Sequence, residues 1–238
     1  RIQAGVRFDH ASKVGSTWAP RFNAAFDLIP RVWTLSGGDG ITAKMPTLLY
    51  LYPEKAYFEY VNINELANES IPENERLFMT TTKVYDTENH NLKVAKNHKA
   101  EIGLRLNVGK VSASVTAFQE RLKNGYSLDY TFDTFNTFTS NEYTRNANGD
   151  LILASSLPVL NSYYTPTNHL NVETQGLEFD INVGRIEAIR TAFQLNGAWM
   201  RTKSWNDSYH FYDNSGTAAS SRKPVAIYEA GTSKSYRQ

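Results

Sequence analysis

The stretch GGDGITAKMPTLLYLYP, residues 37–53, combines glycines, a lysine and tyrosines, as many loops that bind phosphate groups do. A Walker A loop needs a lysine that follows glycine and precedes Ser or Thr, but Lys44 stands between Ala43 and Met45. A Rossmann fingerprint needs a third glycine at the position of Ala43 and then a helix, yet Pro46 follows. We therefore predict no nucleotide site, but a strand end that needs flexible glycines and then an ordered loop.

No other stretch combines the residues and the spacing of a catalytic site, a metal site or a cofactor site. The chain has no cysteine, which excludes thiol nucleophiles and zinc–cysteine sites. Glu178 and Asp180 stand two residues apart on one strand face, which favours a hydrated wall over a glycosidase pair. The sequence NANGD (146–150) predicts a hairpin turn, because it lacks the glutamate of a calcium loop. Five histidines stand without ligand spacing: His10, His90, His98, His169 and His210.

Composition excludes some partners and leaves others open. The 238 residues carry a formal net charge of +1 and no long basic run, so we predict no nucleic-acid partner. No uncharged apolar run is long enough for a transmembrane helix, whereas the half-apolar strands of a membrane barrel would pass unnoticed in mean hydropathy. Aromatic residues are 13% of the chain and gather in the connections, which suits an interfacial belt or a surface for sugars or peptides.

The elements that would position these residues are β-strands, because apolar and polar residues alternate strictly. In residues 99–108, Ile102, Leu104 and Leu106 share one face, while Glu101 and Arg105 share the other. The same alternation runs through residues 1–9, 21–28, 111–117, 176–183 and 191–199. A short helix is expected only around residues 62–76. About ten residues per strand suits a tilted bilayer crossing, although a soluble sheet with one hydrated face alternates equally well.

The connections alternate in length along the chain. Three are short, at residues 29–31, 109–110 and 184–188, and four are long, at residues 10–20, 39–98, 126–173 and about 202–230. In an up-and-down sheet this order places every short turn at one end and every long loop at the other. Outer-membrane barrels have that asymmetry, whereas Greek-key sandwiches do not sort their turns in this way.

Four segments resemble, in order, the barrel of TonB-dependent outer-membrane receptors. The first is the glycine-rich stretch, through Gly38, Gly40, Ala43, Pro46, Leu48 and Leu51-Tyr52-Pro53. The second matches through Asn91-Leu92-Lys93, Lys96, Glu101, Gly103, Leu104 and Arg105, although Val94 and Ala95 replace the proline and glutamate of the family. Residues 111–124 resemble the next strand, and the last segment matches through Thr174, Gly176, Leu177 and Glu178. The matches span about residues 31–200.

The resemblance implies an all-β, antiparallel, up-and-down transmembrane β-barrel with short periplasmic turns and long extracellular loops. Residues 1–238 would supply about eight strands of a 22-stranded barrel. The plug domain, the segment that engages TonB and the last strands are expected outside this chain, and Ser235 begins one more strand. The implied function is uptake of a siderophore, glycan, peptide or cobalamin across the outer membrane of a Gram-negative bacterium. TonB would supply the energy, outer-membrane lipid would surround the barrel, and similarity to SusC-like importers would add a surface lipoprotein lid.

The resemblance also assigns roles to side chains. The residues expected to face the lumen, where they would contact the substrate or the plug, are Arg7, Asp9, Arg21, Asp27, Lys99, Glu101, Arg105, Glu178 and Asp180. The loop residues expected to contact substrate are Lys44, Tyr50, Tyr52 and Tyr57. Alternation predicts that Leu104, Phe179 and Leu195 face lipid. The alternative is a soluble β-rich carbohydrate-binding or adhesin-like module, whereas a glycoside hydrolase has no independent support in the sequence.

Overall fold

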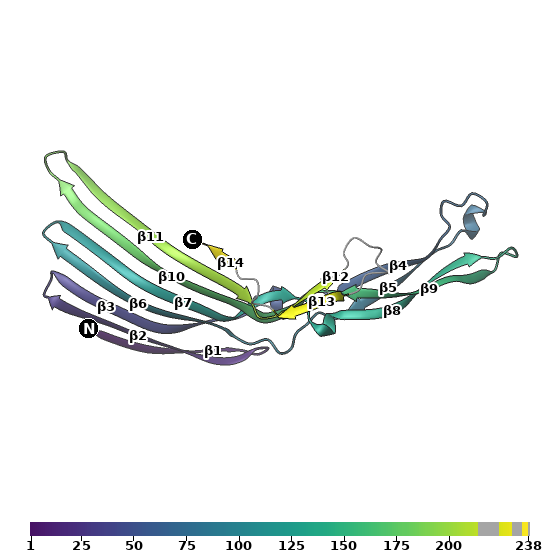
Figure 1. Cartoon of the computed structure of the whole chain (residues 1–238), viewed down its shortest axis with the longest axis horizontal. Coiled ribbons are helices and arrows are strands. Elements are labelled where there is room, and N and C mark those ends of the chain that lie inside the picture. Colours follow the sequence, from purple (N-terminus) through teal and green to yellow (C-terminus); the bar gives the residue numbers. More distant parts are fainter. Residues whose placement is uncertain (214–223, 230–234, 238) are drawn as a thin grey trace.

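A computed structural model describes residues 1–213, 224–229 and 235–237 of the chain. Eight strands form one antiparallel sheet in the order β1-β2-β3-β6-β7-β10-β11-β14, with β1 and β14 as its edges (Figure 1). The strands are β1 (Ile2–Ala11), β2 (Gly15–Ile29), β3 (Trp33–Lys44), β6 (Ala95–Val108), β7 (Val111–Asp129), β10 (Thr165–Ile186), β11 (Thr191–Asn206) and β14 (Ser235–Arg237). This confirms the all-β, antiparallel, up-and-down prediction, including a strand that begins at Ser235; Gln238 lies outside the described residues.

Three tight turns join neighbouring strands at one end of the sheet, which we call the turn end (Figure 1). They lie at residues 30–32, 109–110 and 187–190. Arg31 and Arg190 adopt positive φ angles of 65° and 51°, which lets the chain reverse within so few residues. The last turn lies beyond the predicted residues 184–188, because β10 continues through a bulge at Gly184 as far as Ile186.

The opposite end, which we call the loop end, differs from prediction at the first connection. Residues 10–20 were expected to form a long loop, but β1 and β2 pair up to Ala11 and Gly15 and leave a three-residue turn. Pro20 interrupts the sequence pattern, yet it lies opposite Val6 where β2 pairs with β1 alone. A proline is tolerated in a strand where its missing N–H needs no second partner.

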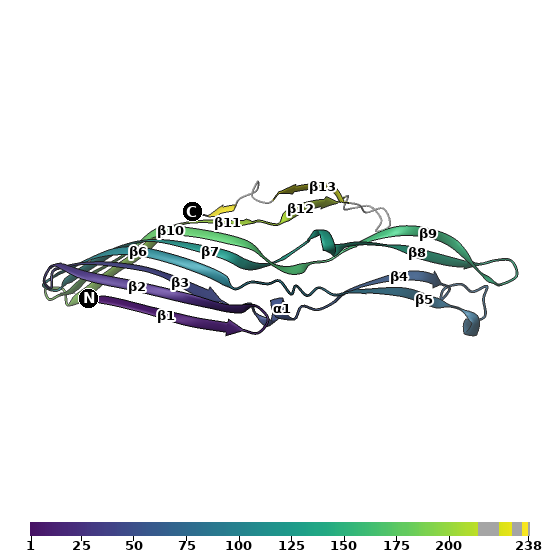
Figure 2. The same ribbon diagram turned by 90° about the horizontal axis from the view of Figure 1, so that it is seen from below.

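The next two long connections are hairpins that extend beyond the sheet (Figures 1 and 2). Their strands are β4 (Ala56–Asn64) with β5 (Phe78–Tyr85), and β8 (Phe135–Arg145) with β9 (Leu151–Ser162). The predicted turn at residues 146–150 joins β8 to β9. Single helical turns are α1 (Leu48–Leu51), η1 (Glu73–Glu75) and η2 (Phe132–Thr134), so the helix expected around residues 62–76 is wrong except for η1.

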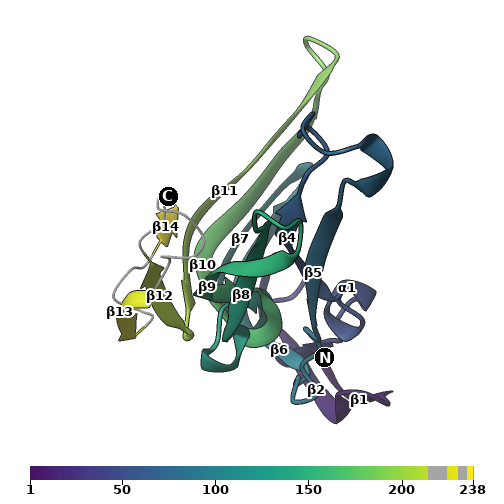
Figure 3. The same ribbon diagram turned by 90° about the vertical axis from the view of Figure 1, so that its right-hand side faces the viewer.

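Viewed from the hairpin end, the two hairpins lie in front of the sheet, with a third strand pair to one side (Figure 3). That pair is β12 (Tyr209–Asp213) with β13 (Pro224–Glu229), within the fourth long connection. Residues 214–223 and 230–234 of that connection lie outside the described residues, as do the side chains of His210, Phe211 and Tyr212. Strands β4 and β8 contact each other, and we call these two packed hairpins together the hairpin layer.

Strand register gives the sheet one apolar and one polar face, because residues directly opposite in a ladder point to the same side. Leu104 lies between Leu35 and Val115, and Val115 lies opposite Phe179. Leu195 lies opposite Ile181 in the next row of the same face, so the three residues predicted to face lipid share the apolar face. This face is exposed over much of its area: Phe26 is 68%, Leu195 60% and Trp199 58% exposed.

The small buried core lies at the loop end rather than between sheet layers. Leu92, Ala95 and Tyr126 form it, and Tyr50 and Leu122 pack against it. The Tyr126 hydroxyl accepts a hydrogen bond from Ala95 N and lies 3.0 Å from the carbonyl oxygens of Lys44 and Lys93. This core therefore joins the end of β3 to the start of β6 across the long connection. Among the described residues, no helix has the length and apolarity needed to cross a membrane.

Candidate functional site

The polar face of the sheet contains all nine residues that the sequence assigned to the lumen. Register links them across strands: Arg21, Gly40 and Lys99 lie in one row, and Asp27, Thr34 and Arg105 lie in another. The remaining positions are the polar-face residues of β1, β6 and β10, namely Arg7, Asp9, Glu101, Glu178 and Asp180. The structure therefore gathers on one surface charges that are up to 173 positions apart in the chain, from Arg7 to Asp180.

Ion pairs and hydrogen bonds organise this polar face. Lys99 Nζ lies 3.0 Å from Glu101 Oε2 and 3.7 Å from Glu120 Oε1. Arg7 Nε donates to Asp9 Oδ2 at 2.8 Å. These side chains stay substantially solvated, and such pairs contribute little to stability. Their charge remains accessible from the polar face, where it can contact a polar solute or another polar surface.

The glycines of the opening stretch lie within β3 rather than at its end, which corrects the sequence-based interpretation. A Cβ added to Gly38 would lie 2.6 Å from Asn23 Oδ1 and 3.3 Å from Glu101 Oε1, and one at Gly40 would lie 3.0 Å from Arg21 Cγ. The missing side chains therefore give neighbouring long side chains room to lie across β3. The result is a polar hollow whose lining includes Arg21, Asn23, Gly38, Gly40, Lys99 and Glu101.

The four loop residues predicted to contact substrate occupy different environments. Lys44 is the last residue of β3 and is exposed, at the loop end of the polar face. Tyr50 packs its ring 5.3 Å from that of Tyr126, next to the small core. Tyr52 is 58% exposed, and Tyr57 on β4 is 67% exposed. The structure does not gather these four residues into one site, because Tyr57 lies on a hairpin that extends away from the sheet (Figure 1).

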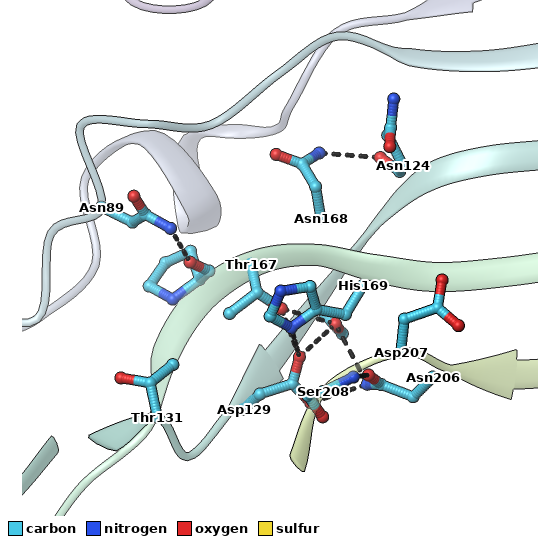
Figure 4. Close-up of polar contacts among 12 residues, drawn as sticks. Asn89, Asn124, Asp129, Thr131, Thr167, Asn168, His169, Asn206, Asp207 and Ser208 are labelled. Carbon is cyan, nitrogen blue, oxygen red and sulfur yellow. Dashed lines mark hydrogen bonds and ion pairs between the residues drawn. The ribbon is translucent and has the colours of Figure 1, made fainter. Parts of the chain in front are cut away.

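A polar junction at the loop end holds the strands where they leave the sheet (Figure 4). The Asp129 carboxylate of β7 accepts hydrogen bonds from Ser127 Oγ and Asn206 Nδ2, both at 2.7 Å, and from Thr167 Oγ1. The side chain of Asn168 donates to the carbonyl oxygens of Lys93, at 2.9 Å, and Asn124, at 2.7 Å. Sequence reasoning missed this junction because, except for the local contact of Ser127, its partners lie 38 to 77 positions apart in the chain.

An ion pair clamps the two hairpins together near their tips. Arg145 at the end of β8 donates from Nε to Glu65 Oε1 at 2.8 Å and from Nη2 to Oε2 at 3.1 Å. The backbone N–H of Leu77 donates to the same carboxylate at 3.0 Å. Hydrogen bonds from Arg145 hold the pKa of the Glu65 carboxyl below its ordinary value, and those to Glu65 raise the pKa of Arg145. The bidentate geometry gives this clamp a defined orientation.

Many loop aromatics pack against one another within the hairpin layer. Tyr60 and Phe138 bring their ring centroids to 4.7 Å, and those of Tyr85 and Tyr163 are 5.2 Å apart. Asn161, only 1% exposed, donates to the Tyr85 hydroxyl at 2.9 Å and accepts a hydrogen bond from the Tyr60 hydroxyl. These rings therefore build the hairpin layer itself, a role that sequence reasoning ranked below a membrane belt or a ligand surface.

The part of the chain that the structure describes contains no cluster of side chains suited to a metal ion. Within residues 1–213, 224–229 and 235–237, no group of three or more His, Asp or Glu side chains is placed to hold a metal ion. Glu178 and Asp180 border a shallow hollow with Ser114, Thr116 and Asn196, side by side on the polar face. This arrangement presents polar groups to solvent along the sheet.

An exposed apolar face and a charged opposite face, with tight turns at one end of the sheet and three long connections at the other, are typical of the wall of a membrane β-barrel. The family model "TonB dependent receptor-like, beta-barrel" matches residues 1–233, and the chain belongs to this family. Members of this family are receptors and transporters of the Gram-negative outer membrane, not enzymes, and the chain is a segment of such an outer-membrane barrel.

Several solved structures are similar to the chain at low sequence identity. The siderophore receptor PirA from Acinetobacter baumannii is 19% identical, over 99% of this chain and 36% of its own, with a TM-score of 0.50. The RagAB peptide transporter is 16% identical, over 97% of this chain and 22% of its own, with a TM-score of 0.45. The R480A mutant of the ferric enterobactin receptor PfeA from Pseudomonas aeruginosa, in complex with enterobactin, is 15% identical, over 99% of this chain and 42% of its own. Its TM-score is 0.39. The chain thus spans less than half of each, and no curated protein matches it.

Proposed function

We propose that residues 1–238 form part of the barrel wall of a TonB-dependent transporter that takes up a nutrient across the outer membrane. The family match over residues 1–233 carries this proposal, and the two chemically distinct faces of the sheet support it. The nutrient would pass inside the barrel beside a plug domain. TonB would supply the energy through that plug, and the barrel would change no covalent bond of the nutrient.

The polar face is the wall of the transport path in this proposal. Its nine charged residues would face the lumen, where hydrated ion pairs such as Lys99–Glu101 can exchange partners with a plug or a passing solute. Gly38 and Gly40 leave the polar face of β3 without side chains at these two positions. Neighbouring side chains such as Arg21 therefore lie across β3 instead of projecting inward. Such a wall is polar without being obstructed.

Capture of the nutrient would fall to the loop end. The exposed rings of Tyr52 and Tyr57 and the ammonium group of Lys44 are free of the small core and would contact the nutrient, whereas Tyr50 would support the loop from inside. Candidates for the nutrient are a siderophore, a glycan, a peptide and cobalamin. Because the similar PirA is a siderophore receptor, a ferric siderophore is the first of these to test. A surface lipoprotein lid over the hairpins remains a further candidate partner.

A soluble carbohydrate-binding or adhesin-like module is the alternative. It would have to leave the apolar face in water, with Phe26 and Leu195 60% exposed or more. Contiguous apolar patches of this kind are rare on soluble monomers. The exposed apolar face therefore favours the membrane wall.

The test of transport uses the full-length receptor that contains this chain. Cells that lack the receptor are compared with cells that express it, for uptake of labelled ferric siderophores, oligosaccharides, peptides and cobalamin. We expect receptor-dependent uptake of one class, which is lost when the proton gradient is collapsed or TonB is deleted. Uptake of none of the four classes, or uptake that survives TonB deletion, would contradict the proposal.

The orientation of the two faces has a separate test, because the chain has no cysteine to confuse labelling. Single cysteines at Leu104, Phe179 and Leu195 should react with a probe dissolved in lipid. Matched cysteines at the polar-face positions Ser114 and Thr116 should react with water-soluble reagents instead. Labelling of all five positions by water-soluble reagents alone would count against a lipid-facing wall.

A further inference from the structure

Three exposed aromatic rings at the loop end come from three separate connections of the chain. Phe132, between β7 and β8, is 58% exposed, and Tyr164, between β9 and β10, is 52% exposed. Tyr209, at the start of β12, is 48% exposed. We call these three rings the aromatic platform. The sequence shows only that aromatic residues gather in the connections, because it does not show which connections meet.

Ring contacts link the members of the aromatic platform. Phe132 and Tyr209 meet edge to face, with ring centroids 5.2 Å apart and an interplanar angle of 61°. Tyr164 stacks on Tyr130 with centroids 4.1 Å apart, and Tyr130 also contacts Phe135 at 5.6 Å. Tyr130 and Phe132 belong to the same connection, so both pairs are anchored in one segment. Rings that pack in these preferred geometries support one another's orientation.

The polar junction fixes the backbone beneath the rings (Figure 4). The side chain of Asn206 donates to Asp129 Oδ1 at 2.7 Å and accepts from the backbone N–H of Ser208 at 2.7 Å. It therefore ties the residue before Tyr130 to the residue before Tyr209. A binding surface that is held in place before its ligand arrives loses little conformational entropy on binding.

Strand register places this junction on the polar face of the sheet. Asn196 lies opposite Asp180, which belongs to that face, and the ladder from Asn196 to Asn206 is uninterrupted. Because the two asparagines are an even number of positions apart on one strand, their side chains point to the same side. The aromatic platform therefore stands at the loop end of the polar face. A nutrient that enters a barrel from this end would meet these rings before the ion pairs of the wall.

Exposed carboxylates flank the aromatic platform. Asp133 and Asp207 each stand within two residues of a platform ring, and both are exposed. Burial raises the pKa of the neighbouring Tyr163 hydroxyl, and the negative charges of Asp133 and Asp86 raise it further. Negative charge at this position repels an anionic ligand, and a ferric tris-catecholate siderophore is such an anion. The platform is therefore better suited to a ligand without negative charge.

Flat rings beside carboxylates suit a neutral sugar. The face of an aromatic ring is negative, so it attracts the weakly positive C–H groups on one face of a sugar ring. Sugar hydroxyl groups donate strong hydrogen bonds to carboxylates. We propose that the aromatic platform binds a neutral oligosaccharide, with sugar rings stacked on Tyr164 and Tyr209 and hydroxyl groups at Asp133 and Asp207.

This inference rests on the proposed transport function and selects one of its four candidate nutrients. Similarity to PirA makes a ferric siderophore the first candidate to test, whereas the charge and the rings at the loop end favour a glycan. The two candidates differ in net charge, so one experiment can decide between them.

Isothermal titration calorimetry of the full-length receptor in detergent tests the proposal. The probes are neutral hexasaccharides of glucan, xylan, mannan and galactan, together with an oligogalacturonate and a ferric tris-catecholate as anions. At least one neutral sugar should bind, and neither anion should compete with it. Tyr164→Ala and Tyr209→Ala should each weaken this binding about tenfold, as is typical when an aromatic anchor is removed from a binding surface.

Two further variants serve as controls. Tyr164→Phe keeps the ring and should retain the affinity, which separates stacking from folding. Phe78→Ala removes a ring that is 51% exposed on β5, outside the aromatic platform, and should leave the affinity unchanged.

Three results would overturn the inference: unchanged sugar binding in Tyr164→Ala, an equal loss in Phe78→Ala, or binding of the ferric tris-catecholate and of no neutral sugar. The last result would leave the proposed transport function standing. That function fails on a different observation, namely uptake that is absent for every nutrient class or that survives deletion of TonB.

Discussion

In the eight-stranded sheet the large apolar side chains are exposed, whereas in the hairpin layer of β4–β5 and β8–β9 polar groups occupy many of the buried positions. Leu195 in the sheet is 60% exposed, but Asn161 and Glu65 in the hairpins are 1% and 7% exposed. The sheet can leave its apolar face open because lipid covers it in a membrane. The hairpins lie in water, so they must bury their own contacts and satisfy each polar group among them.

The comparison shows two ways to hold β-strands in place. The sheet relies on long ladders, with ion pairs that stay solvated on its polar face. The hairpin layer adds to its ladders a bidentate ion pair, the Asn161 amide between two tyrosine hydroxyls, and packed rings. A change on the apolar face should therefore disturb the whole barrel, and a change in the hairpin layer should stay local.

The largest effect is expected where a charge enters the apolar face. Leu104→Arg places a guanidinium beside Leu35 and Val115 and should destabilise the barrel by about 2–4 kcal/mol. The matched change Thr116→Arg on the polar face, opposite Glu178, should be nearly neutral. Urea unfolding of the full-length receptor in lipid vesicles measures both. Equal losses would mean that the two faces do not differ in their surroundings.

A smaller effect on stability is expected from alanine substitutions at two glycines, because the added Cβ atoms would meet different kinds of neighbouring atom. A Cβ at Gly176 would lie 2.4 Å from the backbone oxygen of Trp199, which cannot move aside alone, so Gly176→Ala should cost about 1–3 kcal/mol. At Gly38 the nearest atom is the end of the flexible Asn23 side chain, so Gly38→Ala should cost less than about 0.5 kcal/mol. The same unfolding assay compares them, and the reverse order would contradict this account of the sheet.

The junction between the two regions provides the third comparison. Tyr126→Phe removes the hydroxyl that bonds to Ala95 N and to a carbonyl oxygen, and it should destabilise the protein by about 1 kcal/mol. Amide hydrogen exchange should increase at residues 92–95, which the hydroxyl holds. Tyr57→Phe on the exposed face of β4 is the control and should change neither quantity. Unchanged exchange in Tyr126→Phe would show that packing alone holds the junction.

The smallest effect on the whole molecule is expected from acid, which should loosen the hairpin clamp. Because hydrogen bonds from Arg145 depress the folded-state pKa of Glu65, the clamp stabilises the fold at neutral pH, and this stabilisation is lost as pH falls through that lowered pKa. Spin labels on cysteines at Glu69 and Ala147, near the two hairpin tips, should report a broader distance distribution in acid. In Glu65→Gln the distribution should be broad at both pH values. A pH response that persists in Glu65→Gln would point to another group.

Prediction from sequence succeeded best where the pattern is local. Alternation located the strands, and register then placed all nine predicted polar residues on one face and Leu104, Phe179 and Leu195 on the other. The turn at residues 146–150 was visible in its Asn and Gly residues, and β14 begins at the expected Ser235. These features depend on neighbours in the chain, so the chain alone reveals them.

Prediction failed where a distant partner decides the outcome. We predicted a long loop after β1 because Pro20 interrupts the alternation. Pro20 pairs with β1 but has no partner on β3, so its missing N–H needs no second partner and β2 continues through it. The glycines of β3 looked like a strand end, but side chains of β2 and β6 explain them. The loop aromatics looked like a belt or a ligand surface, and their partners lie in other hairpin strands.

The sequence by itself determined the class of the protein, its alternating faces and its family, because side-chain direction in a strand follows from position alone. Only the tertiary structure decided which residues meet. Glu65 and Arg145 are 80 positions apart, and Lys96 and Lys123 face each other only because β6 and β7 pair in one particular register. A shift of one residue in a ladder would move every such contact to the other face. Contacts of this kind depend on register and on packing between hairpins, which no local pattern specifies.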